Sequence, residues 1–116
     1  MKRFLAVYTG APTSMASWDA LPEAERQARQ ARGIAAWKQW AQDHAGVIVD
    51  LGGPLSRTKR ASRDGVTDVR NNLAGYTIVE AQSHEAAARL FLDHPHFAIF
   101  PGDGVEIMEV MPIPAG

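Results

Sequence analysis

The strongest candidates for chemistry are two histidines in the segment Asp93-His94-Pro95-His96. Histidine is the side chain best suited to proton transfer near neutral pH, and its neutral ring can also bind zinc. The i, i+2 spacing brings the two rings together only in an extended segment, which Pro95 favours, and Asp93 could orient one ring. The pair therefore predicts either a catalytic acid/base site formed by His94 and His96 or a structural role for both in the core.

The sequence does not predict a metal or a cofactor. A zinc site needs at least three protein ligands, and no third ligand lies at a recognised spacing from the two histidines. The chain has no cysteine, which excludes disulfides, thiol nucleophiles and cysteine zinc sites. We also find no Ser-His-Asp order, phosphate-binding loop or dinucleotide fingerprint.

Aromatic and acidic side chains elsewhere could line a pocket for a small-molecule ligand. Trp37 and Trp40 share the apolar face of an expected helix, where they either pack in the core or form an aromatic wall. Tyr8 and Tyr76 lie in expected strands, as core residues or as phenolic hydrogen-bond partners. The candidate pocket residues are Tyr8, Trp37, Trp40, Tyr76, Asp50 and Asp103.

The elements that must position these residues begin with a strand and a long helix. The segment Arg3–Tyr8 is continuously apolar after its first residue and predicts a strand covered on both faces. The composition of Gly10–Ser17 predicts a loop. A helix follows from about Leu21 to Ala45, with glutamates in its first turn. Gly33 could divide this helix into two, and Gly46 is the expected C-terminal cap.

Two more strands follow, separated by a polar stretch. Val47–Leu51 and Gly75–Ala81 have strand-like composition, and the adjacent glycines after the first of them predict a bulge or a bend. The polar stretch Arg57–Asn72 contains the turn signal Asp64-Gly65. It therefore forms either two strand arms around that turn or an ordered loop.

A second helix and a last strand complete the chain. Ser83 is the expected N-cap of the helix, and Pro95 is expected to end it. Helical spacing places four residues of this second helix on one face: Ala87, Leu90, Phe91 and His94. The last strand is expected at Val105–Pro114.

The resulting β-α-β-β-α-β order predicts a single α+β domain over residues 1–116 with ferredoxin-like topology. Four strands form an antiparallel sheet with both helices on one face. No strand has a purely polar face, so we expect a second copy of the sheet to cover the other face in a homodimer. Embedded carboxylates of Asp50, Glu80 and Glu109 then need partners. The candidate partners are Arg3, Arg57 and Arg70.

Composition bears on whether the protein binds nucleic acid or membranes and on its cellular location. The formal net charge of −1 provides no global basic field for nucleic acid or an anionic membrane. The one basic cluster, from Arg57 to Arg63, adjoins Asp64 and is interpreted as a solvated loop. The N-terminal apolar run of about five residues is shorter than a signal peptide needs, and no segment approaches the ~20 apolar residues of a membrane span. We expect a cytoplasmic protein.

The segments RFLAVYTG and AGVIVDLGGPL are similar to the first strand and the Gly-rich second strand of the YCII-related family, in particular of its DGPF-type members. Asp64-Gly65 matches the turn pair, Ala74-Gly75-Tyr76 matches the Gly-Gly-Tyr strand, and Glu109–Ile113 matches the terminal strand. Val66-Thr67 stand where the signature has Pro-Phe. The helix segment ARGIAAWKQW has no counterpart of the helix-borne histidine of the YCII branch. The resemblance spans nearly the whole chain.

The resemblance implies a dimeric α+β barrel. Some relatives are linked to lactone isomerisation or to dechlorination of aromatic breakdown products. It therefore implies a small cofactor-free enzyme that acts by acid/base proton transfer on a small ring or lactone-type substrate. The alternative is a non-catalytic dimeric module that binds a small ligand or another protein.

Overall fold

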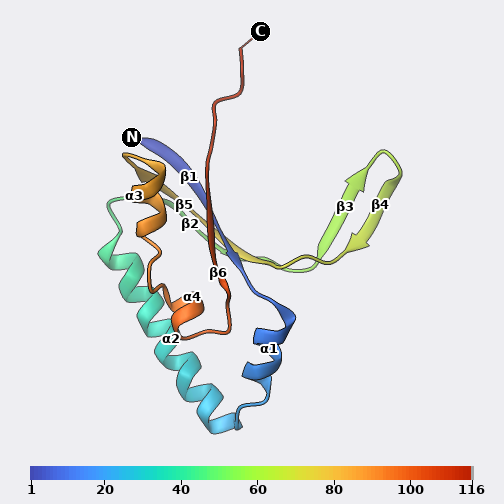
Figure 1. Cartoon of the computed structure of the whole chain (residues 1–116), viewed down its shortest axis with the longest axis vertical. Helices are drawn as coiled ribbons and strands as arrows, with labels where there is room; N and C mark the ends of the chain where they lie inside the picture. Colours follow the sequence, from blue (N-terminus) through green and yellow to red (C-terminus); the bar gives the residue numbers. More distant parts are fainter. Residues whose placement is uncertain (116) are drawn as a thin grey trace.

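A four-stranded antiparallel sheet forms the centre of the structure, a computed structural model that describes residues 1–115 (Figure 1). Its strands are β1 (Lys2–Thr9), β2 (Ile48–Pro54), β5 (Leu73–Ala81) and β6 (Gly104–Glu109). They lie in the order β2-β5-β1-β6, and each neighbouring pair is antiparallel. This order is that of the ferredoxin-like topology, so the predicted α+β class is confirmed.

The core lies on one face of this sheet. Phe4, Ala6 and Tyr8 of β1 alternate with more exposed residues, and Thr77 and Val79 of β5 do the same. This period of two directs all five side chains to the same side. Helices α2 (Glu23–Asp43) and α3 (His84–Arg89) pack there. They contribute Trp37, Trp40 and Ala87 to the core.

A short helix, α1 (Pro12–Asp19), occupies the segment that composition assigned to a loop. The loop prediction for Gly10–Ser17 is therefore wrong. Pro12 is tolerated at the first helical position because its missing N–H has no partner there in any helix. Trp18 contacts Phe100 with ring centroids 5.8 Å apart, and the Arg29 guanidinium lies 5.5 Å from the Trp18 ring. These long-range contacts hold α1 in place.

The long helix is a single helix rather than two. Gly33 is buried in its middle, and a Cβ atom at this position would overlap the ring of Phe100. The glycine therefore allows close approach of the loop before β6 and does not break the helix. The helix ends at Asp43, with His44 in the C-cap position instead of the expected Gly46.

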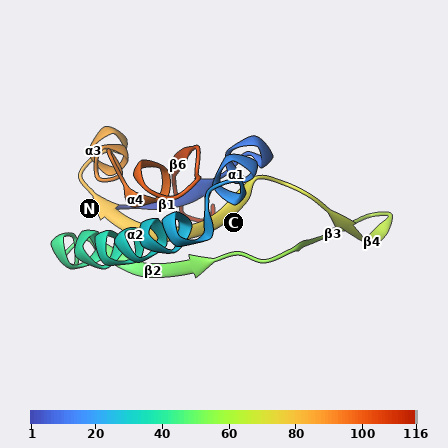
Figure 2. The same ribbon diagram turned by 90° about the horizontal axis from the view of Figure 1, so that it is seen from below.

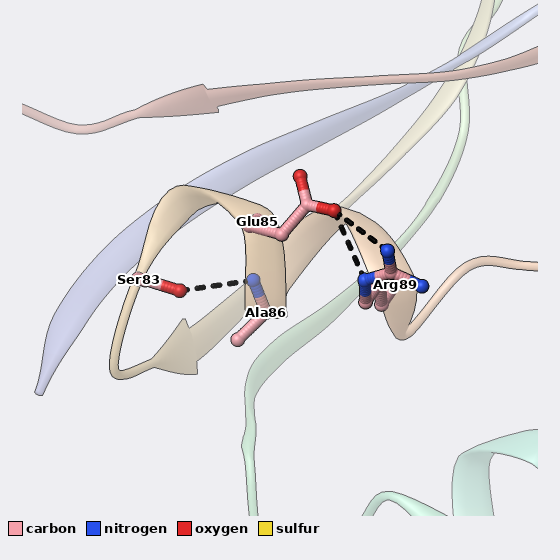
Figure 3. Close-up of polar contacts among 4 residues, drawn as sticks. All are labelled: Ser83, Glu85, Ala86 and Arg89. Carbon is pink, nitrogen blue, oxygen red and sulfur yellow. Dashed lines mark hydrogen bonds and ion pairs between the residues drawn. The ribbon is translucent and has the colours of Figure 1, made fainter.

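The N-terminus of α3 agrees with its sequence signal. The Ser83 hydroxyl accepts a hydrogen bond of 3.1 Å from the Ala86 N–H, as predicted for an N-cap (Figure 3). Glu85 and Arg89 form an i, i+4 ion pair of 2.9 Å in the same close-up. Both groups are exposed, so the pair adds little to stability.

Pro95 does not end this helix. Helix α3 ends at Arg89, and Pro95 instead opens a further helix, α4 (Pro95–Ala98). The prediction is wrong because proline is also favoured in the first turn of a helix. Asp93, between the two helices, has a left-handed backbone conformation with a φ of 56°. As a result His94 and His96 lie at the start of α4, not on a continuous helix face.

The polar stretch forms the first of its two predicted alternatives, a pair of strand arms. β3 (Thr58–Ser62) and β4 (Gly65–Val69) make a separate two-stranded antiparallel sheet that turns at Asp64-Gly65. Gly65 has a φ of 109°, which suits glycine. Figures 1 and 2 both show this hairpin projecting away from the rest of the chain. We refer to residues 57–70 as the arm.

The outer face of the four-stranded sheet, opposite the helices, is not covered by any other element within residues 1–115. Register places Leu5 between Ile78 and Met108, and Val7 between Tyr76 and Glu106. Met108 is 42% exposed. The body is only 18 Å deep along its shortest axis, which is enough for one layer of helices on one sheet.

The embedded carboxylates find nearby partners. Glu80 pairs with Arg3 at 3.9 Å, as one of the predicted pairings allowed, and Glu109 pairs with Lys2 at 3.8 Å. Asp50 accepts a hydrogen bond of 2.8 Å from the Gly52 N–H. Within residues 1–115, Arg57 and Arg70 pair with none of these three carboxylates. The last strand ends at Glu109, earlier than the predicted Pro114.

None of the helices within residues 1–115 is both long and apolar enough to cross a membrane.

The adjacent glycines of β2 give a matched test of the predicted bulge, which is present between Asp50 and Gly53. Gly52 has a φ of 69°, and a Cβ atom there would overlap the backbone carbonyl of Tyr76. Gly53 has open space around it. We expect Gly52→Ala to lower the free energy of unfolding by about 1–3 kcal/mol, because it combines a strained φ with a backbone clash. Gly53→Ala should change it far less in the same urea titration. Equal losses for the two variants would contradict the bulge geometry.

Candidate functional site

A cavity of about 650 Å³ lies between α2 and the adjoining ends of β2 and β5. This volume is within the range of small-molecule sites, and most of its lining is apolar. Gly52, Gly53 and Gly75 form part of the floor, where the absence of side chains leaves room. The larger residues of the wall are Tyr8, Ile34, Trp37, Leu51, Tyr76, His96 and Phe100.

The structure brings four of the predicted site residues together at this cavity. Tyr8, Trp37 and Tyr76 line it, and so does His96. They come from β1, α2, β5 and α4, four elements that are distant in sequence. The Tyr8 ring lies 5.0 Å from that of Trp37 and 5.2 Å from that of His96 between centroids. The three rings therefore form one continuous aromatic wall.

Three other predicted pocket residues lie elsewhere. Trp40 is in the core, where its Nε1 donates a hydrogen bond of 2.9 Å to the Leu90 carbonyl. Asp50 is exposed and holds the turn at Gly52. Asp103 is exposed and accepts a hydrogen bond of 2.9 Å from the Ser14 hydroxyl. Helical and strand periodicity gives the face of a residue but not its depth along the element, and these three positions differ in depth.

His96 has a defined tautomer. Its Nε2 lies 2.7 Å from the carbonyl oxygen of Thr9, and a carbonyl can only accept, so Nε2 carries the proton. In the neutral ring Nδ1 is then an unprotonated acceptor. Nδ1 makes no hydrogen bond within residues 1–115, and it is not a fully buried atom. The structure therefore leaves a basic lone pair on a ring that forms part of the cavity wall.

Burial keeps this ring neutral at physiological pH. His96 is 8% exposed, and desolvation lowers its pKa below the ordinary value of 6.5. The Thr9 carbonyl and the charge of Asp103 both act in the opposite direction and raise the pKa. Gly102 lies directly against the Nε2 side of the ring, where any Cβ atom would overlap it. The ring of His96 can therefore occupy this position only because residue 102 has no side chain.

His94 lies behind this wall and does not line the cavity. It is fully buried among the rings of Trp37, Trp40 and Tyr8, with centroid distances of 4.5, 4.6 and 5.2 Å. Its Nδ1 accepts the His96 N–H at 3.0 Å and so caps α4. The proton of the neutral ring must then be on Nε2, a buried atom without a hydrogen-bond partner in the described chain. The rings of Trp37 and Trp40 stand at 89° and 73° to the imidazole, a geometry suited to N–H···π contact.

A short hydrogen-bond chain fixes Tyr8. The Thr77 hydroxyl donates to the Leu51 carbonyl at 2.8 Å, so the Tyr8 hydroxyl must donate to Thr77 at 2.7 Å. Burial raises the pKa of Tyr8 to about 12. Tyr8 is therefore a neutral phenol with its hydroxyl held by Thr77.

The structure also shows site residues that sequence reasoning missed. Phe100 and Ile34 form part of the wall, and Lys38 and Gln42 stand at its α2 side. Lys38 and Gln42 follow Ile34 by four and eight residues, so helical periodicity could have placed them beside the Trp37 side of the helix. Nothing in the sequence identifies Phe100, because its place depends on Gly33 and on α1. No group of three or more acidic or histidine side chains suited to a metal ion occurs in residues 1–115.

The buried His94 predicts a specific loss of stability in acid. Burial lowers the pKa of His94 to about 3, with smaller effects of His96 and His44 in the same direction. Between about pH 6.5 and pH 3 the unfolded chain binds a proton here and the folded chain does not, so stability falls as the pH falls, by at most about 1.4 kcal/mol per pH unit. We expect His94→Asn to keep the α4 cap and to remove this contribution to the slope in urea titrations at several pH values.

The matched control for this experiment is His84→Asn, which removes an exposed histidine outside the aromatic cluster. It should leave the His94 contribution in place. If His94→Asn keeps the full slope of the wild-type protein, His94 is not the neutral buried group described here.

Comparison with known proteins identifies the fold and goes no further. No family model matches the chain, and no curated protein matches it either. Among solved structures, the chain is similar to 5-chloro-2-hydroxyhydroquinone dehydrochlorinase from Burkholderia phenoliruptrix AC1100, in a complex with 2,5-dihydroxybenzoquinone. The TM-score is 0.54 at 16% identity, over 94% of this chain and 93% of the other. The chain therefore has the overall fold of that protein.

Proposed function

We propose that this protein is a small cofactor-free enzyme that transfers a proton to or from a small cyclic substrate. The observation that carries the proposal is the place of His96 on the wall of an apolar cavity of about 650 Å³, with an Nδ1 that has no hydrogen-bond partner within residues 1–115. A histidine that acts as a general base must be unprotonated at the working pH, within reach of the substrate, and fixed in one tautomer. The geometry of His96 supports all three requirements.

The chemistry follows from the hydrogen bonds of the ring. His96 Nδ1 accepts a proton from an acidic C–H or O–H of the bound ring, and the imidazolium then keeps its Nε2–H bond to Thr9. The nearby charge of Asp103 favours this cation. Tyr8 and Trp37 provide flat apolar surfaces beside His96 for a ring to pack against. If the same nitrogen returns the proton to another atom of the substrate, the net reaction is an isomerisation. If the electron pair left by the proton instead expels a leaving group such as chloride, the net reaction is an elimination, and the imidazolium then releases its proton to water.

A lactone or a hydroxylated aromatic ring is the substrate class that we propose. The cavity favours a flat, mostly apolar molecule, and the fold is shared with a dehydrochlorinase whose structure holds a dihydroxybenzoquinone. One segment similar to the YCII-related family, Ala74-Gly75-Tyr76, lies at this cavity. We propose membership of that family from this resemblance and the shared fold. The shared fold and the apolar cavity make lactones and hydroxylated aromatic rings the first compounds to test.

We further propose a homodimer in which two copies pack their outer sheet faces together. The central residues of this face in β1 and β5, Leu5, Val7 and Ile78, are only half-buried in a single chain. An isologous contact of two such faces would remove them from water.

The proposed base is tested by His96→Asn. We expect this variant to lose about 100-fold or more in kcat/KM on whichever lactone or halogenated hydroquinone the wild-type protein converts. It should still bind 2,5-dihydroxybenzoquinone, followed through quenching of tryptophan fluorescence, since Trp37 lines the cavity. Binding without conversion of any such compound by the wild-type protein would instead support the non-catalytic ligand-binding module.

A second prediction concerns the pH profile. Because His96 must be unprotonated to act, kcat/KM should fall in acid with a midpoint below the ordinary histidine pKa of 6.5. Asp103 raises the pKa of His96, so Asp103→Asn should move this midpoint to still lower pH. Asn can still accept the bond from Ser14. A midpoint that stays in place, or moves upward, would exclude His96 as the titrating base.

A further inference from the structure

Within residues 1–115, the arm of residues 57–70 projects away from the other elements. Twelve of its fourteen residues are exposed, and both views show it extending away from the helices and the main sheet (Figures 1 and 2). An isolated two-stranded hairpin is marginally stable in water. Val66, beside the turn, is 69% exposed. These features are typical of a segment that packs against another molecule.

The charge of the arm is opposite to that of the body. The arm contains five basic and two acidic residues, a net charge of +3, and the remainder of the chain contains seven basic and eleven acidic residues, a net charge of −4. Only Lys59 of the basic residues has an ion pair within residues 1–115, at 2.7 Å from Asp68. Arg57, Arg60, Arg63 and Arg70 have none.

The uncovered sheet face has acidic edges that suit such an arm. Asp50 lies on the edge strand β2 opposite Ile78, and Glu106 lies on the edge strand β6 opposite Val7. Neither carboxylate has an ion-pair partner within the part of the chain that the structure describes. The face is thus an apolar centre between two acidic edges, which we call the acidic rim.

We propose that the arm of one copy binds the acidic rim of a second copy of this chain. The arm connects the end of β2 to the start of β5, two strands of the same uncovered sheet. It therefore lies next to the sheet face that the second copy would contact. In a twofold dimer each arm contacts the other body, and the pairing of +3 with −4 occurs twice. This inference rests on the homodimer proposed above, and it is independent of the chemistry of His96.

Cross-linking between isotopically distinct copies tests where the arm lies. The chain has no native cysteine, so Ala61→Cys in the arm can carry a single benzophenone maleimide. The labelled protein is mixed with ¹⁵N-labelled wild-type protein, irradiated, and digested for mass spectrometry. We expect cross-links that join the arm to the β2 or β6 edge of the ¹⁵N copy. Ala35→Cys, an exposed alanine of α2, is the matched control and should not give them. Arm cross-links confined to one copy would overturn the proposal.

Charge reversal tests the electrostatic part. Arg63→Glu in the arm should weaken the dimer about tenfold or more in sedimentation equilibrium at low salt, and high salt should reduce the difference. Arg32→Glu on the exposed side of α2 makes the same change in net charge and should have little effect. Unchanged dimerisation of Arg63→Glu would overturn the arm proposal but leave the sheet-to-sheet dimer standing. A monomeric wild-type protein would overturn both.

The same variants separate a protein partner from a polyanion. If Arg63→Glu leaves the dimer unchanged and abolishes binding of a short DNA duplex, the arm binds phosphates and the proposal is wrong. Binding of 2,5-dihydroxybenzoquinone by each variant shows whether the cavity is intact, so failure of the arm proposal remains distinct from failure of the proposed activity.

Discussion

The carbonyl oxygen of Thr9 is the point on which the site depends. It accepts the Nε2–H of His96 at 2.7 Å and the backbone N–H of Asp103 at 2.9 Å. One backbone atom at the end of β1 therefore fixes both the start of α4 and the loop that leads into β6. Because the oxygen can only accept, it also decides which nitrogen of His96 is basic. The same carbonyl oxygen of Thr9 therefore determines the tautomer of His96, the position of its ring and the path of the loop before β6.

The cluster behind His96 shows why its partner histidine has a different role. His94 is surrounded by aromatic rings and caps α4 through Nδ1, so its lone pair is already used. Its protonation would place a charge in a fully buried site, which the lowered pKa reflects. His96, two residues later, instead donates a hydrogen bond to a backbone carbonyl and lines the cavity. The two histidines therefore differ because the ring of His94 accepts a hydrogen bond from the backbone and the ring of His96 donates one to it.

The sequence alone was sufficient for the fold class and for the four main strands along the chain, because hydrophobic periodicity and turn signals are local. The Ser83 cap, the Asp64-Gly65 turn and the bulge at the paired glycines depend only on a few neighbouring residues, and all three are present. Helix α1 and the role of Phe100 were not predictable, since they depend on contacts between residues far apart in sequence. For the same reason, the sequence does not show which residues of one helix face reach the cavity. Trp37 and Trp40 share a helix face, yet one lines the cavity and the other packs in the core.

The cavity itself is a product of missing side chains as much as of aromatic ones. Gly52 turns β2 over Tyr76 with a backbone conformation that other residues disfavour, and Gly75 passes close beneath the Tyr8 ring. Gly102 lets the loop before β6 lie against His96. A side chain at any of these positions would fill the space or displace a ring. Glycines of this kind are easily overlooked in a sequence, because a search for a catalytic site looks for side chains with functional groups. Here the space for a substrate and the fixed position of the base both rely on glycine.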